Sequence, residues 1–311
     1  MSDISREGLT ALTWVFTGAG IVLTAGRYAI RLRTVKKLQA DDYVHGVALL
    51  VLIGYVSTYT VMFPLNYSIE FWVAGRGEEP SARDVKRYFR LEIAVSLLFW
   101  IVITLVKFAF LLFYRLIFGV SRPFMRAWWA VTVFTMITFL ICFLSVLWAC
   151  ESPQHLLVTE RCLSDRALNR TTVITSMWCG FNVASDLTII ALPLWMLRGL
   201  QMPTSRKLGL AALFLVAITD VIFDITRTVY TVHGGAVALD TIWDILEPTI
   251  ALIISSLPTY KALLSSSTKR KTTSYQNLAS GVANKLSTTH RSEADESQDI
   301  ELNSSPIQAE R

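Results

Sequence analysis

The sequence predicts an all-α, polytopic membrane protein with seven transmembrane helices. Of its 311 residues, 53% are apolar and only 17% are charged, whereas an ordinary soluble domain carries roughly 25% charged residues. The charges gather in short clusters, and seven stretches between them reach the roughly 20 mostly apolar residues that a spanning helix needs. This pattern excludes a soluble enzyme, a fibrous protein and a largely disordered chain. We interpret the net charge of +5 as loop charge that orients helices, and expect no nucleic-acid partner.

The first two predicted spans are almost free of charge. Residues 9–30 form the first, with Arg27 near its end. We expect this span to be retained, because residues 1–8 lack the basic region of a signal peptide and no cleavage site follows. Residues 43–63 form the second span and contain no Lys, Arg, Asp or Glu.

The next three spans are equally apolar, with single ionisable interruptions. The third, 93–113, is interrupted only by Lys107, and the fourth, 127–149, has no charge. The fifth, 172–197, contains Asp186. Because a charge at mid-bilayer costs at least about 2.5–3.5 kcal/mol, Lys107 and Asp186 should face the bundle interior and pair.

The last two spans, 208–230 and 241–264, carry most of the charged residues that lie within the predicted spans. The three in the sixth span are spaced i, i+4 and i+7 and therefore share one helix face. These residues are Asp220, Asp224 and Arg227 in the sixth span, and Asp244 and Glu247 in the seventh.

The buried polar residues predict an internal network. Asn182 and Asp186 form an i, i+4 polar pair on the fifth span. Depth along the spans predicts two layers: a deep one of Lys107, Asp186 and Asp220, and an outer one of Asp224, Arg227, Asp244 and Glu247. Two interpretations stay open. The residues are interhelical contacts that fix packing, or they line a polar cavity that binds a small molecule or ion, or moves protons.

Basic residues in alternate connections predict the orientation. The segments 31–42, 114–126, 198–207 and 261–271 together carry 14 Lys and Arg against two acids. The positive-inside rule then places the N-terminus outside or lumenal and the C-terminus in the cytoplasm. The predicted organisation is a short outer N-terminus at 1–8, a membrane domain at 9–264 and a disordered Ser/Thr-rich cytoplasmic tail at 265–311.

The predicted outer loops hold candidate modification sites. Cys150 and Cys162 both lie between the fourth and fifth spans, in a compartment that permits disulfides. We predict that they form a bridge; two free thiols are the alternative. Asn66 and Asn169 begin glycosylation sequons, which would make the chain a glycoprotein, although both lie close to the membrane. No two of the four histidines have metal-ligand spacing, so we expect no metal.

An ordered set of short motifs resembles the fungal rhodopsin-domain family of seven-helix integral membrane proteins, which includes members from satratoxin-type mycotoxin gene clusters. The resemblance covers about residues 10–265. Its motifs are Ala40-Asp41-Asp42-Tyr43 after a basic segment, Lys107 followed by Phe113-Tyr114-Arg115, Cys150 with Cys162, Asn182 and Asp186 followed by Leu192-Pro193, Arg227, Trp243 with Glu247, and Leu257-Pro258.

The family name suggests retinal, but the residues oppose it. A rhodopsin needs a Schiff-base lysine in the middle of its seventh span, and the stretch from Glu247 to Leu257 contains none. Lys261 lies beyond Pro258, and Lys107 belongs to the third span. We therefore expect no chromophore and no other cofactor.

Three functions remain, of which the resemblance favours the first. It is an integral membrane accessory protein of fungal secondary-metabolite biosynthesis that binds or handles a small apolar molecule. The alternatives are a receptor-like signalling protein and a membrane-embedded acid/base enzyme using Asp186, Asp220 or Asp224. The expected partners are membrane lipids and a small apolar ligand or pathway metabolite. The pair Asp41-Asp42 is either a signalling signature or a cap for the second helix.

Overall fold

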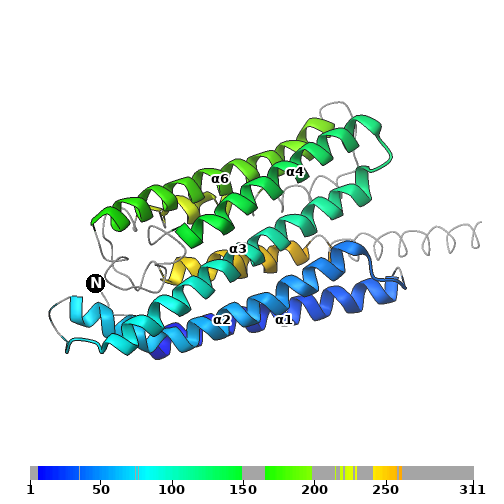
Figure 1. The fold of residues 1–311 in the computed structure, drawn as a ribbon. Coiled ribbons are helices and arrows are strands. Elements are labelled where there is room, and N and C mark those ends of the chain that lie inside the picture. The colour runs from blue at the N-terminus through cyan, green and yellow to red at the C-terminus, as the bar shows by residue number, and fades with distance from the viewer. Residues whose placement is uncertain are drawn as a thin grey trace, which may run out of the picture. The chain divides into compact units, whose positions relative to one another are not determined.

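The computed structural model describes most of the membrane domain. The described residues are 6–34, 36–73, 75, 77–148, 165–197, 214, 218–219, 221–226, 228–229, 241–257 and 259–260. This part of the chain is helical apart from short connections and contains no strand, and five of its helices are long and apolar enough to cross a membrane. The predicted all-α membrane fold is confirmed (Figure 1). The predicted tail, 265–311, and the orientation of the termini stay predictions.

The helices extend beyond the predicted spans. Their bounds are Arg6–Thr34 for α1, Ala40–Val73 for α2, Ala82–Phe118 for α3, Arg122–Ser145 for α4, Val146–Trp148 for the 3₁₀ turn η1, and Asp165–Leu197 for α6. Residues 241–257 and 259–260 are also helical and are called the last helix here. Hydropathy marks only the part of a helix that lies in hydrocarbon, about 30 Å thick, whereas the 37 residues of α3 extend about 55 Å.

Local sequence signals explain where two of these helices begin. The Ser81 hydroxyl accepts from the backbone N–H of Asp84 and donates to the Asp84 carboxylate, so this pair caps α3. Pro123 occupies the first turn of α4, where its missing N–H has no helical partner to lose.

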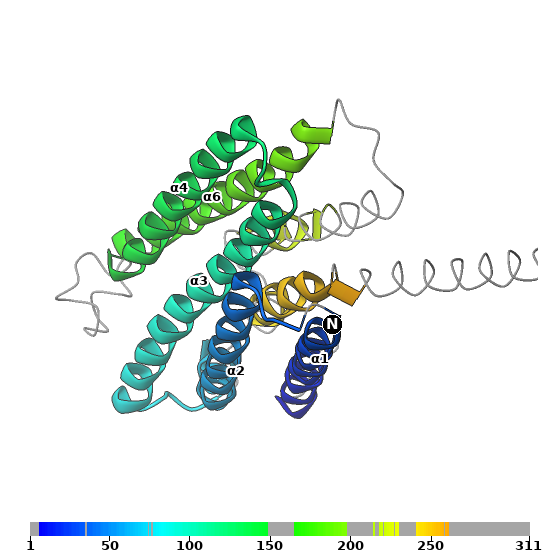
Figure 2. The same ribbon diagram turned by 90° about the vertical axis from the view of Figure 1, so that its right-hand side faces the viewer.

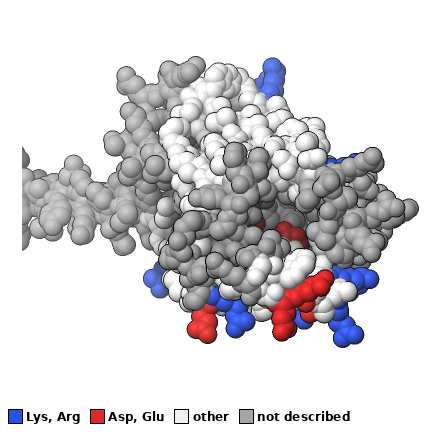
Figure 3. All heavy atoms as spheres, turned by 90° about the vertical axis from the view of Figure 1, so that its left-hand side faces the viewer, with Lys and Arg blue, Asp and Glu red and all other residues white. Residues whose placement is uncertain are grey.

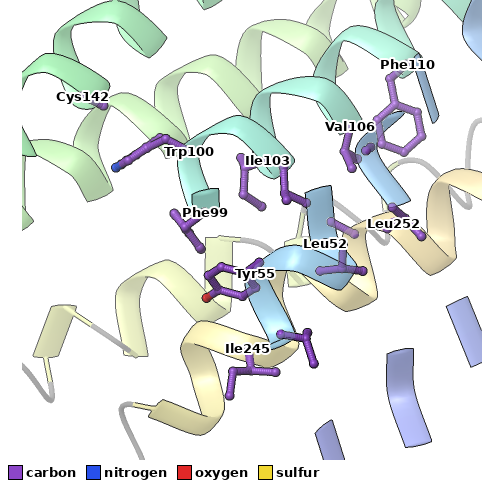
Figure 4. Close-up of a cluster of buried hydrophobic side chains, with 14 of the residues drawn as sticks. Leu52, Tyr55, Phe99, Trp100, Ile103, Val106, Phe110, Cys142, Ile245 and Leu252 are labelled. Carbon is purple, nitrogen blue, oxygen red and sulfur yellow. The ribbon is translucent and has the colours of Figure 1, made fainter. Parts of the chain in front are cut away.

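The core is built around α3. In the most apolar stretch of α3, 61% of the residues are buried, whereas in the corresponding stretch of α4 only 22% are buried. Helix α2 packs most extensively against α3, and α4 packs against α6. Figure 2 shows these as two pairs of neighbours, with α1 beside α2. In Figure 4, Leu52 and Tyr55 of α2 lie beside Phe99 and Ile103 of α3, above Ile245 of the last helix.

The surface agrees with a lipid environment. Figure 3 shows most of the charged side chains along the lower edge of this face, with some basic side chains at the top and side and acidic atoms near the centre, whereas most of the described surface in that view is uncharged. Helix α4 exposes Val133, Ile137, Leu140 and Leu144. Such a continuous apolar face is stable next to lipid and is rare on soluble monomers.

Helix α1 buries a face of small and polar residues. Thr13, Thr17, Gly20, Thr24 and Arg27 recur every three or four positions and are buried. Each of these threonine hydroxyls donates to the carbonyl four residues earlier, so it needs no other partner. Small residues let neighbouring helices approach closely.

Candidate functional site

The first candidate site surrounds a buried lysine. Lys107 of α3 is 7% exposed, and its Nζ lies 2.9 Å from the Asp186 carboxylate of α6. It also donates to the Asn182 side-chain oxygen (2.5 Å) and to the Ser185 hydroxyl (2.7 Å). Positions 182, 185 and 186 fall on one helix face because of their i, i+3 and i+4 spacing. The structure therefore contains the predicted pairing of Lys107 with Asp186 of the fifth span.

Asn182 connects this lysine to two further carboxylates. Its amide nitrogen donates to Asp224 Oδ2 (2.6 Å) and to Glu247 Oε1 (3.3 Å), while its oxygen accepts from Lys107. Asp224 and Glu247, which the sequence assigned to the outer layer, are thus linked to the deep residue Lys107 through one amide, and the two layers stay a prediction. We call Lys107, Asn182, Ser185, Asp186, Asp224 and Glu247 the lysine network.

The lysine network borders a small cavity between α3, α4 and α6. Lys107, Asn182 and Ser185 line it, together with Trp100 of α3 and Thr138 of α4. Within the cavity, the centre of a water molecule can occupy a volume of about 10 Å³. This volume is close to the minimum that holds one water. One carboxylate oxygen of Asp186 is buried and has no hydrogen-bond partner among the described residues.

Asp244 belongs to a different contact. Its backbone carbonyl accepts from Tyr55 (2.8 Å) and its carboxylate accepts from Tyr59 (2.9 Å). These bonds attach the last helix to α2. The same interface corrects the expectation for Asn66, which lies inside α2 rather than in a loop. Asn66 is 6% exposed and its amide nitrogen donates to the Thr241 hydroxyl, so a glycan cannot be attached there without unpacking the helices.

A second buried charge group was missed by the sequence reasoning. Arg27 is 2% exposed. Its guanidinium lies 2.6 Å from Asp41 and 2.8 Å from Asp42, and it donates to the Ser255 carbonyl (2.7 Å). Arg31 lies 2.9 Å from Asp41. We call Arg27, Arg31, Asp41 and Asp42 the arginine cluster, which joins α1, α2 and the last helix.

The proposed capping role of the acidic pair is found for one member. Asp42 Oδ2 accepts from the backbone N–H of Gln39, the residue before α2, as in the second half of a capping box. Below the arginine cluster, His45 bonds to the hydroxyls of Thr24, Ser255 and Ser256. The sequence did contain a signal for the arginine cluster. Arg27 lies inside an apolar span, and a short connection separates this span from Asp41 and Asp42.

The other predicted site residues fall into two groups. Asn169 lies in α6 and is exposed, so its glycosylation stays a prediction. Asp220, Arg227, Cys150 and Cys162 lie outside the described residues. The predicted disulfide therefore remains a prediction, while Cys142 and Cys179 are free thiols.

The described residues do not fit a retinal Schiff base. Residues 241–257 and 259–260 of the last helix contain no lysine. Lys107 is buried, but its Nζ is bonded to Asp186, Asn182 and Ser185, and it belongs to α3.

Comparison with known proteins supports this architecture. The family model "Fungal rhodopsin domain" matches residues 26–266. A relative, "Satratoxin biosynthesis SC1 cluster protein 4" of Stachybotrys chartarum, is 25% identical over 162 residues, which is 52% of this chain. The match spans 60% of that protein's length. Because the family model covers most of the chain, this multi-pass membrane protein belongs to the fungal rhodopsin domain family.

Proposed function

We propose that this protein is an integral membrane accessory protein of fungal secondary-metabolite biosynthesis, and that the lysine network helps to bind a small, lipid-soluble molecule. One observation carries the ligand part of the proposal: Lys107, Asn182 and Ser185 line a cavity with room for one small polar group of such a molecule. The pathway part is supported by the relative from a satratoxin biosynthesis cluster.

The energetics support a role beyond packing. Each ionisable residue in a membrane interior costs at least about 2.5–3.5 kcal/mol, and such residues commonly mark functional pathways. The network brings Lys107, Asp186, Asp224 and Glu247 together around one amide. A lipid-soluble metabolite partitions into the membrane, where this polar surface offers it hydrogen-bonding groups that lipid does not.

The test removes the charge while keeping the fold. The gene is deleted in its own host and restored as wild type or as Lys107→Gln/Asp186→Asn, a double variant that neutralises both members of the pair. The matched control is Arg122→Gln, which removes an exposed cation at the start of α4. Small molecules are then profiled by mass spectrometry at equal protein levels.

We expect the deletion to lose one product family and accumulate an intermediate. Arg122→Gln should restore the product, and the double variant should not. Full rescue by the double variant would leave the network with only a packing role. An unchanged profile after deletion, under conditions where the protein is expressed, would contradict the pathway role and favour the receptor-like alternative.

A further inference from the structure

Two tryptophans, Trp100 and Trp243, have a buried indole nitrogen without a hydrogen-bond partner among the described residues, and the first of them is almost fully buried. Trp100 of α3 is 4% exposed, and its indole nitrogen has no hydrogen-bond partner among the described residues. An indole N–H only donates, and leaving a buried donor unsatisfied costs about 1–3 kcal/mol. The site around this N–H therefore calls for an acceptor.

Two neighbouring tryptophans have acceptors of their own. Trp128, also 4% exposed, donates to the Leu111 carbonyl at 2.7 Å. Trp178 packs edge-on against Trp100, with ring centroids 5.7 Å apart, and donates to the Ser145 hydroxyl at 2.7 Å. Trp100 thus differs from both of these neighbours; among the described residues Trp243 of the last helix shares its unsatisfied indole nitrogen.

The indole of Trp100 forms part of the wall of the small cavity that the lysine network borders. In Figure 4 its nitrogen points toward the side of α4 that carries Cys142, another residue of the cavity wall. Thr138 lines the same cavity and is 5% exposed. The indole of Trp100 therefore lies in the cavity wall, with its nitrogen turned toward α4.

The charge around the cavity indicates what fits there. The lysine that lines the cavity, Lys107, is already paired with Asp186, so an anion is not needed for neutralisation. The remaining wall includes Ile103, Phe139 and Phe181, which are apolar. A neutral group that accepts one hydrogen bond satisfies Trp100 without adding a charge to a low-dielectric interior.

We propose that this cavity binds one neutral oxygen acceptor at the Trp100 indole N–H. The acceptor is a water molecule or the oxygen of a lipid-soluble guest, such as a ketone or alcohol, that displaces the water. The guest form rests on the proposed function, because it specifies the ligand as uncharged and oxygen-bearing. The water form stands without it.

The experiment observes the indole protons directly. The full chain is labelled with ¹⁵N at its tryptophan indoles and purified in detergent, and Trp100 is assigned with Trp100→Phe, or with Trp100→Tyr if that variant does not fold. Magnetisation transfer from water is measured at Trp100 and at Trp128, the equally buried control. Cyclohexanone and methylcyclohexane, two lipid-soluble probes of similar size, are then added separately.

We expect transfer from water at Trp100 to be several-fold stronger than at Trp128. A guest site is supported if cyclohexanone suppresses this transfer and shifts the Trp100 signal while methylcyclohexane does neither; if neither probe acts, the acceptor is water. Equal transfer at both tryptophans, or a Trp100 signal insensitive to water and ketone alike, would overturn the inference. Neither result changes the metabolite profile expected for Lys107→Gln/Asp186→Asn, so the two proposals fail separately.

Discussion

The arginine cluster and the lysine network both bury charge, but their surroundings differ. In the arginine cluster two guanidiniums face two carboxylates, and Arg27 also bonds to the last helix. The lysine network instead borders a cavity. Each group holds a buried polar atom without a hydrogen-bond partner among the described atoms, Arg31 Nε in the first and an Asp186 oxygen in the second.

This difference teaches which of two similar-looking charge groups to test for function. A buried ion-pair group whose charges pair mainly across helices has little left to offer a ligand. A group that keeps polar atoms at a cavity retains that capacity. We therefore propose that the arginine cluster serves assembly of the bundle and that the lysine network contacts the ligand.

The largest effect should come from breaking the arginine cluster. Arg27→Met leaves Asp41 and Asp42 buried with less compensating charge, which costs about 3–5 kcal/mol. Thermal unfolding in detergent should show a greatly lowered midpoint, with Arg122→Met unchanged. If the Arg27→Met protein is stable but fails to restore the metabolite, the arginine cluster, and not the lysine network, would be the group that acts in function.

The next largest effect separates charge from packing in the lysine network. Lys107→Gln alone leaves Asp186 without its cation and should destabilise the protein by about 3 kcal/mol. Adding Asp186→Asn should recover most of that loss, because a neutral pair of similar volume avoids the uncompensated charge. A double-mutant cycle on the unfolding midpoints measures the coupling. Additive losses would show that the two side chains do not act as a pair.

The sequence predicted the spans better than the contacts between them. Hydropathy placed the apolar part of α3 at 93–113, but the helix runs from Ala82 to Phe118 because Ser81 caps it outside the apolar run. The spacing of Asn182 and Asp186 identified one face of α6. Which carboxylates approach Asn182 depends on the rotation and tilt of other helices, so the sequence did not indicate that Asp224 and Glu247 bond to it.

The arginine cluster shows the reverse case. Its acids lie only 14 and 15 residues from Arg27, so an unpaired arginine in an apolar span was a sufficient signal for them. The Ser255 carbonyl is 228 residues away and carries no sequence signature, because every residue has a backbone carbonyl.

A smaller effect should follow from removing the amide that joins the carboxylates. Asn182→Leu deletes the donor to Asp224 and Glu247 and the acceptor for Lys107. We expect a loss of about 1–3 kcal/mol in the unfolding free energy, below that of Arg27→Met. Thr188→Val, on the same helix, removes only a hydroxyl bonded to the backbone and serves as the control. A loss as large as that of Arg27→Met would contradict the distinction between assembly and ligand contact.

The smallest effect concerns the glycine beside the arginine cluster. A Cβ at Gly26 would collide with the Tyr260 hydroxyl, which donates to the Leu23 carbonyl at 2.6 Å. Gly26→Ala should therefore destabilise by about 1–3 kcal/mol, at the lower end because the tyrosine tip can shift. Gly54→Ala meets open space and should stabilise by about 0.5–1 kcal/mol. Equal midpoints for the two variants would show that the close approach is not tight.

The bond from Arg27 to the Ser255 carbonyl can form only late in synthesis of the chain. The two residues are 228 positions apart, and synthesis proceeds at roughly 5–20 residues per second. The first helix therefore waits roughly 10–45 s in the membrane before its last acceptor is made. During that interval Asp41 and Asp42, synthesised within seconds, are the partners that keep the arginine of a nascent chain neutralised. Chains released before residue 255 should retain that early pairing yet lack the closing bond, which makes them natural substrates for membrane quality control.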